Sequence, residues 1–304
     1  MSSFDPDALE CLAAIVEEGG FERAARRLSI TQSAVSQRLR ALEAQVGTVL
    51  IVRSRPLKAT SAGQLLLKHT KMLRLLRADL ERDLKELAPS SLRGVREEER
   101  ISIAINADSI ATWALQALTG LAQQGLPMEI ITDDQDFTHE WLRQGQVLGC
   151  VTTLKQALRG CKVVALGAMD YVAVATPALA QERLGTAGLT AHNFRDIPFI
   201  AFNRKDDMQS EFAGKAFGLK RITLNQLFVP SSEGQVRAVL AGWGASVVPR
   251  LLAQALIDQG LLINLVPGCV LPIQLYWHCW NLESEVLDAL TAALKQSAAS
   301  VLVD

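Results

Sequence analysis

Polar and acidic side chains follow several apolar runs in the second half of this 304-residue chain. They come after ISIAIN, MEIIT, PFIAF and LFVP, in the groups Asp108, Ser109 and Thr112; Asp133 and Asp134; Asp206 and Asp207; and Ser232 and Glu233. If those runs are strands of open α/β sheets, these residues lie beyond the carboxyl ends of strands, where such sheets bind ligands. Helix capping explains one polar residue per helix, but it does not explain two pairs of acids together with a glutamate.

The chemistry of these groups suits a small molecule that carries both a carboxylate and extra positive charge. Backbone N–H groups at helix N-termini bind a carboxylate, and aspartate and glutamate side chains bind a cation. Together they predict a basic amino acid as the ligand. Capping remains the alternative for each residue taken singly, and in that case the cleft takes a different small metabolite.

A second set of polar side chains lies on TQSAVSQRLRALE, residues 31–43. Thr31 is the expected N-cap of a helix at 32–46, which Val35, Leu39 and Leu42 would anchor on the inside. The outward face then holds Gln32, Ser33, Ser36, Gln37 and Arg40 on its first turns. Donors and acceptors there meet base edges when a recognition helix enters the major groove. Since any soluble helix has a polar face, the prediction of DNA binding also depends on what surrounds it.

The surroundings of this helix favour a polyanion. Short helices are expected at 7–18 and 21–28, and residues 20–60 hold eight basic against two acidic residues, a balance of +6. Residues 100–304 hold fifteen basic and eighteen acidic residues, a balance of −3. The stretch at 50–63 predicts two short strands, with Arg53, Arg55 and Lys58 available to phosphates. Residues 1–60 are therefore expected to form a winged helix-turn-helix domain that binds double-stranded DNA.

A long helix is expected at 61–88, and it has leucine at every seventh position from 66 to 87. Such a heptad predicts a dimer seam. The alternative is an amphipathic helix that lies on its own domain, but no adjoining short helix offers it a partner, so pairing between two chains is preferred. Residues 89–99, which contain a Pro-Ser-Ser turn and a run of charges, are expected to be a hinge.

From residue 100 onward, strand-like and helix-like segments alternate, which indicates parallel sheets covered by helices. About 200 residues suffice for two small α/β subdomains. No constellation of catalytic residues occurs: GWGASV lacks the third glycine of a dinucleotide loop, and no Gly-x-Ser-x-Gly elbow or phosphate loop is present. Trp113 and Trp141 either line the cleft or pack in the core, and packing is the preferred interpretation.

The cysteines and histidines show no metal-binding pattern, because none of the five cysteines forms a CxxC pair and the four histidines lack HExxH spacing. We therefore expect no metal, no cofactor and no enzyme activity. The first ten residues lack a basic signal region, and the longest apolar run is interrupted by Asp170. A cytoplasmic protein without a membrane span is expected.

The first sixty residues carry a recurring set of residue types at fixed spacing: Phe21, Ala24-Ala25, Leu28, QSAVS at 32–36, Leu42-Glu43, Gly47, Leu50, Arg53 and the T-x-A-G of 60–63. In these the chain resembles the LysR-type transcriptional regulators; Ile51 departs from the phenylalanine that the family often has there. The resemblance implies an effector domain of two Rossmann-like subdomains of the periplasmic-binding-protein type. Its crossing strands would lie near 171–176 and 274–279. Subdomain I would then hold 100–168 and 280–304, and subdomain II would hold 169–279.

Within that family, five segments resemble the ArgP/LysG branch: NADSIATW (106–113), LGAMDY (166–171), FNRKDDMQ (202–209), SSE (231–233) and LYWH (275–278). The branch senses arginine and lysine and activates a gene for a basic-amino-acid exporter, so the resemblance implies an arginine or lysine effector held by the acidic and hydroxyl groups named above. It also implies a homodimer through the linker helix or a homotetramer, with RNA polymerase as a candidate partner. Two alternatives stay open: a LysR-type regulator of another metabolite, and a solute-binding or enzymatic module with a helical appendage.

Overall fold

The computed structural model describes residues 4–52, 54, 57–87, 100–133, 137–219 and 222–303. Four of the predictions fall outside these residues: the phosphate contacts of Arg53 and Arg55, the effector contact of Asp134, and the hinge at 89–99. No helix among the described residues is both long enough and apolar enough to cross a membrane.

The N-terminal domain consists of three helices and a two-stranded wing, as expected. Its elements are α1 (Pro6–Glu17), α2 (Phe21–Arg27), α3 (Gln32–Val46), and the antiparallel strands β1 (Ile51–Val52) and β2 (Lys58–Ala59). Local signals delimit α3, because the Thr31 hydroxyl accepts a hydrogen bond from the Ala34 amide at 3.2 Å and Gly47 ends the helix at a φ of 78°. Its inner face packs into a core shared with α1 and α2.

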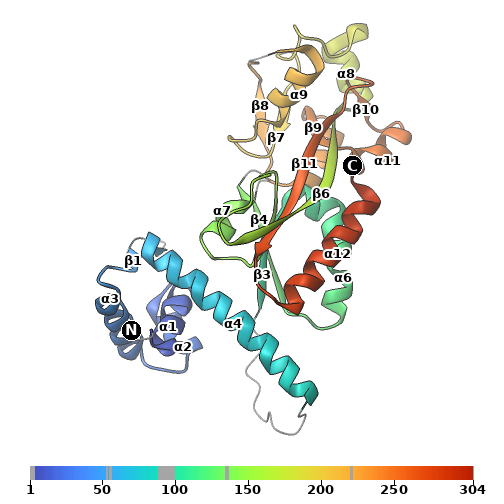
Figure 1. Cartoon of the computed structure of the whole chain (residues 1–304). Coiled ribbons are helices and arrows are strands. Elements are labelled where there is room, and N and C mark those ends of the chain that lie inside the picture. The colour runs from blue at the N-terminus through green and yellow to red at the C-terminus, as the bar shows by residue number, and fades with distance from the viewer. Residues whose placement is uncertain are drawn as a thin grey trace.

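Helix α4 (Ser61–Leu87) runs between the two domains (Figure 1). The expectation that no helix of the same chain covers it is wrong, because α4 packs along α1. Arg74 binds Glu10 and Glu17 of α1, and Lys71 donates to the Gln146 carbonyl at 2.5 Å in the second domain. Burial alone would raise the pKa of Glu17, but Arg74, Lys71 and Arg27 lower it below its usual value. One face of α4 therefore docks within the chain.

Another face of α4 remains uncovered. Leu73, Leu76 and Leu80 are 46, 42 and 57 % exposed, whereas the neighbouring Leu75 is buried at 3 %. These exposed leucines include two of the four heptad positions. Both alternatives for the heptad therefore apply in part. One face of α4 packs on the domains of its own chain, and another face exposes an apolar stripe to solvent.

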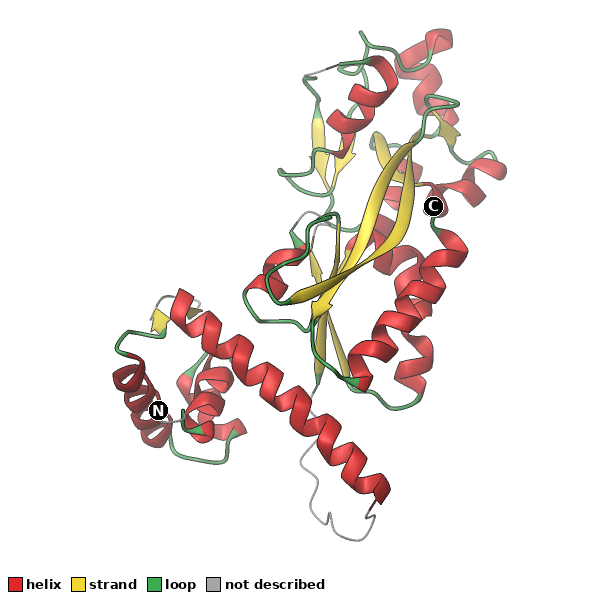
Figure 2. Ribbon diagram, viewed as in Figure 1, coloured by secondary structure: helices red, strands yellow, loops and turns green. Residues whose placement is uncertain are grey.

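The second domain contains a mixed sheet (Figure 2). Its strand order is β4-β3-β5-β11-β6-β9-β7-β8, and β10 pairs with β6. The strands are β3 (Ile101–Asn106), β4 (Met128–Asp133), β5 (Gly149–Thr152), β6 (Cys161–Ala175), β7 (Phe199–Ala201), β8 (Gln226–Phe228), β9 (Ala245–Pro249), β10 (Ile263–Asn264) and β11 (Leu271–Trp280). Strands β3, β4 and β5 are mutually parallel, as are β7, β8 and β9. We name the parts that contain these two triplets subdomain I and subdomain II.

Two long strands connect the subdomains. β6 and β11 pair antiparallel from Leu271 opposite Tyr171 to Trp280 opposite Cys161. The sheet is therefore mixed where strand and helix alternation alone predicted parallel sheets, because these two strands run in opposite directions through both subdomains. The crossing strands expected near 171–176 and 274–279 lie on β6 and β11, except that Thr176 falls just after β6.

Helices cover this sheet on both sides of the crossing strands. They are α5 (Ala107–Ser109), the π-helical turn Ile110–Ala114, α6 (Leu115–Gln123), α7 (Thr138–Arg143), α8 (Pro177–Leu184), α9 (Met208–Phe217), α10 (Ser232–Leu240), α11 (Arg250–Asp258) and α12 (Glu285–Val301). Helix α8 was not predicted, and the strand expected at the LFVP run is β8. Each βα connection places the end of a strand next to a helix start, which positions the candidate site residues.

Candidate functional site

The outward face of α3 lies open to solvent. Thr31, Gln32, Ser33, Gln37 and Arg40 are exposed and Ser36 is half-buried, while Val35, Leu39 and Leu42 are buried beneath them. Thr31 also has a structural role, because its hydroxyl caps the helix and lies 2.9 Å from Ser33 Oγ. The outward face of α3 thus presents amide, hydroxyl and guanidinium groups that the described part of the chain leaves exposed.

Part of the positive charge near α3 is used inside the domain. Arg27 binds Glu17 at 2.6 Å, and Arg38 binds Asp7 at 3.0 Å. In contrast, Arg26, Arg40 and Lys58 are exposed and make no ion pair within the described part of the chain. These three cations, on α2, α3 and β2, are available to a phosphate backbone.

Asp108 is the centre of the second candidate site. It lies just after β3, and Tyr171 of the crossing strand β6 donates a hydrogen bond to Asp108 Oδ2 at 2.6 Å. Burial raises the pKa of Asp108, the hydroxyls of Ser232 and Tyr171 lower it, and the charge of Asp206 raises it further; the net pKa lies above the usual value. Residues from β6, the β7–α9 loop and α10 therefore lie around the carboxyl group of Asp108, which α5 carries.

Several buried polar atoms near Asp108 make no hydrogen bond among the described residues. They are Ser109 Oγ, Ser232 Oγ and both side-chain polar atoms of Asn106. Ser232 contributes to the environment of Asp108, but its hydroxyl is not within regular hydrogen-bond geometry. Because an unpaired buried polar group is costly, such a cluster is typical of a site that a polar ligand completes.

The helix that follows β3 contains an irregular turn next to this cluster. After α5 the chain forms a π-helical turn at Ile110–Ala114, a geometry found frequently at functional sites. Thr112, predicted to contact the effector, donates its hydroxyl to the main-chain oxygen of Asp108 at 2.6 Å. Its hydroxyl is therefore engaged within its own helix.

Of the other residues predicted to contact the effector, Asp206 caps backbone amides, and Asp207 and Glu233 are exposed to solvent. Asp206 caps its own loop, because its carboxyl accepts from the amides of Phe202 and Met208 at 2.7 and 2.9 Å. The N-cap of α10 is Ser231, which accepts from the Gly234 amide at 3.1 Å, so capping does not occupy Ser232.

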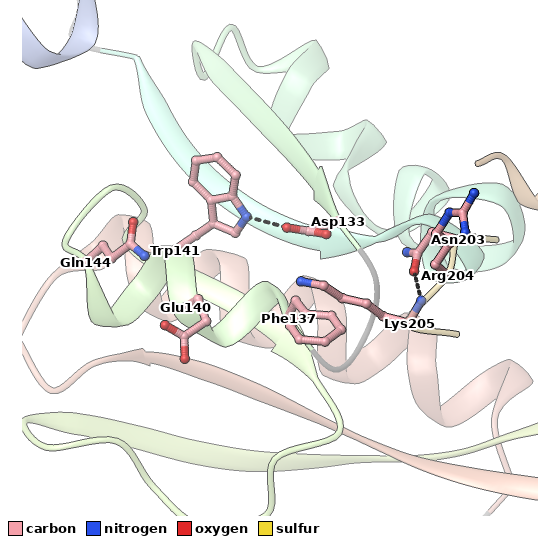
Figure 3. A pocket seen from close by; sticks show the side chains of 8 residues that line it. All are labelled: Asp133, Phe137, Glu140, Trp141, Gln144, Asn203, Arg204 and Lys205. Atoms are coloured by element: carbon pink, nitrogen blue, oxygen red, sulfur yellow. Dashed lines mark hydrogen bonds between the residues drawn. The ribbon is translucent and has the colours of Figure 1, made fainter. Parts of the chain in front are cut away.

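A cavity of about 550 Å³ lies between the subdomains. Subdomain I contributes Asp133, Phe137, Glu140, Trp141 and Gln144, and subdomain II contributes Asn203, Arg204 and Lys205 (Figure 3). Trp141 Nε1 donates to Asp133 Oδ2 at 3.0 Å, and Lys205 Nζ lies 4.6 Å from the centre of the Phe137 ring. One wall is thus acidic and aromatic, and the opposite wall is basic.

Sequence reasoning missed seven residues of these sites: Tyr171, Phe137, Glu140, Gln144, Asn203, Arg204 and Lys205. Arg204 and Lys205 stand in the same FNRKDDMQ run as the predicted acids, which is the signal that could have found them. Trp141 packs against the core and also lines the cavity, whereas Trp113 is 1 % exposed and packs in the core.

Comparison with known proteins agrees with both halves of the chain. Residues 6–64 match the family described as bacterial regulatory helix-turn-helix protein, lysR family, and residues 95–299 match the LysR substrate binding domain. The chain belongs to the LysR family. The resemblance and the fold class predicted from the sequence are thereby confirmed.

Relatives of this LysR-family protein are similar over its whole length. The HTH-type transcriptional regulator ArgP of Pseudomonas aeruginosa is 38 % identical over 100 % of this chain and 99 % of its own. The regulator LysG of Mycobacterium tuberculosis is also 38 % identical, over 98 % of this chain and 94 % of its own. These relatives are named transcriptional regulators and not enzymes. The chain is a LysR-type DNA-binding regulator of the ArgP/LysG type.

Two solved structures share its architecture. The crystal structure of ArgP from Mycobacterium tuberculosis has a TM-score of 0.84 at 38 % identity and covers 99 % of both chains. Full-length LysG from Corynebacterium glutamicum, with bound effector arginine, has a TM-score of 0.73 at 35 % identity and covers 99 % of this chain and 100 % of its own.

Proposed function

We propose that this regulator binds arginine or lysine between its two effector subdomains and in response controls transcription, with a gene for a basic-amino-acid exporter as its target. The observation that carries the effector proposal is the environment of Asp108, whose buried carboxyl accepts a hydrogen bond from Tyr171 and lies beside the buried Ser232 hydroxyl, which has no regular hydrogen-bond partner among the described residues. The arginine bound to the LysG relative supports the same class of ligand. The exporter target rests on the resemblance alone.

The chemistry assigns a part of the ligand to each group. The carboxylate of Asp108 is the counterion for an ammonium group, and Ser109 and Ser232 supply the hydroxyls that complete its surroundings. Amide groups at the start of α10 bind the ligand carboxylate. Asp133, with Phe137 and Trp141 in the same cavity wall, binds the distal cation of the side chain.

The DNA-binding part of the proposal assigns residues 1–60 to DNA and 61–88 to a linker helix. Gln32, Ser33, Ser36, Gln37 and Arg40 face the base edges, with Arg40 also within reach of the phosphate backbone, and Arg53, Arg55 and Lys58 bind phosphates. Two chains pair through the exposed leucines of α4, so that two recognition helices reach neighbouring half-sites. Effector binding then changes how dimers associate into tetramers or contact RNA polymerase.

Isothermal titration calorimetry of the full-length protein tests the effector proposal. Arginine and lysine are titrated beside citrulline and norleucine, which have similar size but lack the distal positive charge. We expect binding of arginine and lysine and at least tenfold weaker binding of the two neutral analogues, because a charge-assisted contact is lost. Equal binding of citrulline would assign the cleft to another class of metabolite.

A further inference from the structure

We propose that Lys205 is a tethered competitor of the effector: in the ligand-free protein its ammonium group occupies the place that receives the distal cation of the ligand. The inference rests on the proposed function, since it names the residue that a basic amino acid must displace. Lys205 lies on the loop between β7 and α9 of subdomain II and reaches Phe137, which precedes α7 in subdomain I (Figure 3).

The contact has the geometry of a cation–π interaction. Lys205 Nζ is 4.6 Å from the centre of the Phe137 ring, inside the range of about 6 Å over which a ring attracts a cation. Asp133, Glu140 and Trp141 share this wall of the cavity. An acidic and aromatic wall that accepts the ammonium group of a lysine side chain has the chemistry needed to accept the ammonium group of free lysine or the guanidinium of arginine.

The loop that carries Lys205 is held in place from within. The Lys205 amide donates to Asn203 Oδ1 at 2.7 Å, and Asp206 binds the amides of Phe202 and Met208 on either side. This internal bonding fixes the backbone and leaves the four-carbon side chain of Lys205 to move. A free cation can therefore replace the ammonium group without rearrangement of the loop.

The neighbouring Arg204 provides a matched comparison. It has the same charge, lies on the same loop and lines the same cavity. Its guanidinium, however, lies 5.5 Å from the ring of Phe228 on β8, which belongs to its own subdomain. Of these two cations only Lys205 connects the two subdomains. Removal of Arg204 therefore changes ligand affinity only through the lost positive charge. Removal of Lys205 changes it through the lost charge and through the lost competition for Phe137.

Calorimetry of the full-length wild type, Lys205→Met and Arg204→Met with arginine and with lysine tests the proposal. We expect Lys205→Met to bind both amino acids about 2- to 5-fold more tightly than Arg204→Met, the factor that corresponds to one exposed cation–π contact. Binding by Lys205→Met that is equal to or weaker than binding by Arg204→Met would overturn the proposal. Equal binding would mean that Lys205 does not compete with the ligand, and weaker binding would mean that Lys205 helps to hold it.

A measurement without ligand separates this inference from the proposed function. Hydrogen exchange of the amides at 138–144 is followed by mass spectrometry in the same three proteins. We expect faster exchange in Lys205→Met only, since the contact to Phe137 holds the start of α7. If the wild type bound neither amino acid, the effector proposal and the competitor role would both fail. If exchange were unchanged while arginine bound, only the competitor role would fail.

Discussion

At the scale of single residues, Asp108 combines an environment that disfavours its charge with neighbours that suit a cationic ligand. Burial and the charge of Asp206 raise its pKa against the opposing hydroxyls of Tyr171 and Ser232. The folded protein therefore holds a proton at Asp108 more tightly than the unfolded chain does. The stability that this proton contributes is complete below the unfolded pKa and is lost as the pH rises through the folded pKa.

This environment predicts the behaviour of Asp108→Asn. Above the raised pKa the variant should melt at a higher temperature than the wild type without ligand, and the difference should vanish in acid. The same change should weaken arginine binding about 10- to 100-fold, because a charge-assisted hydrogen bond is lost. Thermal melts across pH and calorimetric titration measure the two effects. A variant that is less stable at neutral pH and binds arginine normally would show that Asp108 is only structural.

Two adjacent serines at the start of α10 allow capping to be separated from ligand binding. Ser231→Ala removes the cap and should cost about 1 kcal/mol of stability with little change in arginine affinity. Ser232→Ala removes a hydroxyl without a hydrogen-bond partner, so it should leave the melting temperature almost unchanged and weaken arginine binding about 5- to 10-fold. If Ser231→Ala instead weakened arginine binding and Ser232→Ala lowered the melting temperature, the ligand contact would belong to Ser231 and the cap to Ser232.

At the scale of elements, α3 places its polar side chains outward because its apolar residues repeat on one face and its ends are capped. Val35, Leu39 and Leu42 are at most 3 % exposed, which leaves Gln37 and its neighbours on the opposite face. The exposure of this face permits DNA contact, and the nearby cations Arg26, Arg40 and Lys58 favour it. Variants that remove either a base contact or a phosphate contact test whether this face reads DNA.

For this element we expect Gln37→Ala to lower affinity for the selected operator by about 1–3 kcal/mol and to change nonspecific binding little, because base contacts carry discrimination. Lys58→Ala should weaken binding to all duplexes. It should also reduce the slope of the logarithm of the binding constant against the logarithm of salt concentration by about 1, the value for one phosphate contact. Fluorescence anisotropy at several salt concentrations measures both. Equal losses on all sequences for Gln37→Ala would place the base-reading face elsewhere.

At the scale of the whole molecule, α4 joins the domains and leaves an apolar stripe exposed, which we propose as the dimer seam. Arg74, Lys71 and Leu75 hold it against the same chain, while Leu73, Leu76 and Leu80 remain exposed. A helix with two such faces can transmit a change in the effector domain to the DNA-binding domain of the same chain or of a second chain.

Neighbouring leucines of α4 distinguish association from folding. Leu76→Ala should weaken the dimer and therefore operator binding, with little loss of stability at protein concentrations where the chain is monomeric. Leu75→Ala should cost about 2–5 kcal/mol of stability because it opens a cavity in the core. Analytical ultracentrifugation and denaturant unfolding report the two effects. A Leu76→Ala protein that remains fully dimeric would exclude this stripe as the seam.

Local interactions explain what could be predicted from the sequence. The helices of the first domain, the capping by Thr31, the exposed face of α3 and most strands follow from periodicity and caps, which act within a few residues. The acids after the strands predict a site at this edge of the sheet for the same reason. Tertiary structure alone decided that Tyr171 binds Asp108 from 63 positions away, that Lys205 faces Phe137, and that one side of α4 docks on α1. These pairs depend on the antiparallel crossing of β6 and β11 and on the placement of α4, which bring distant segments together and leave no periodic trace in either segment.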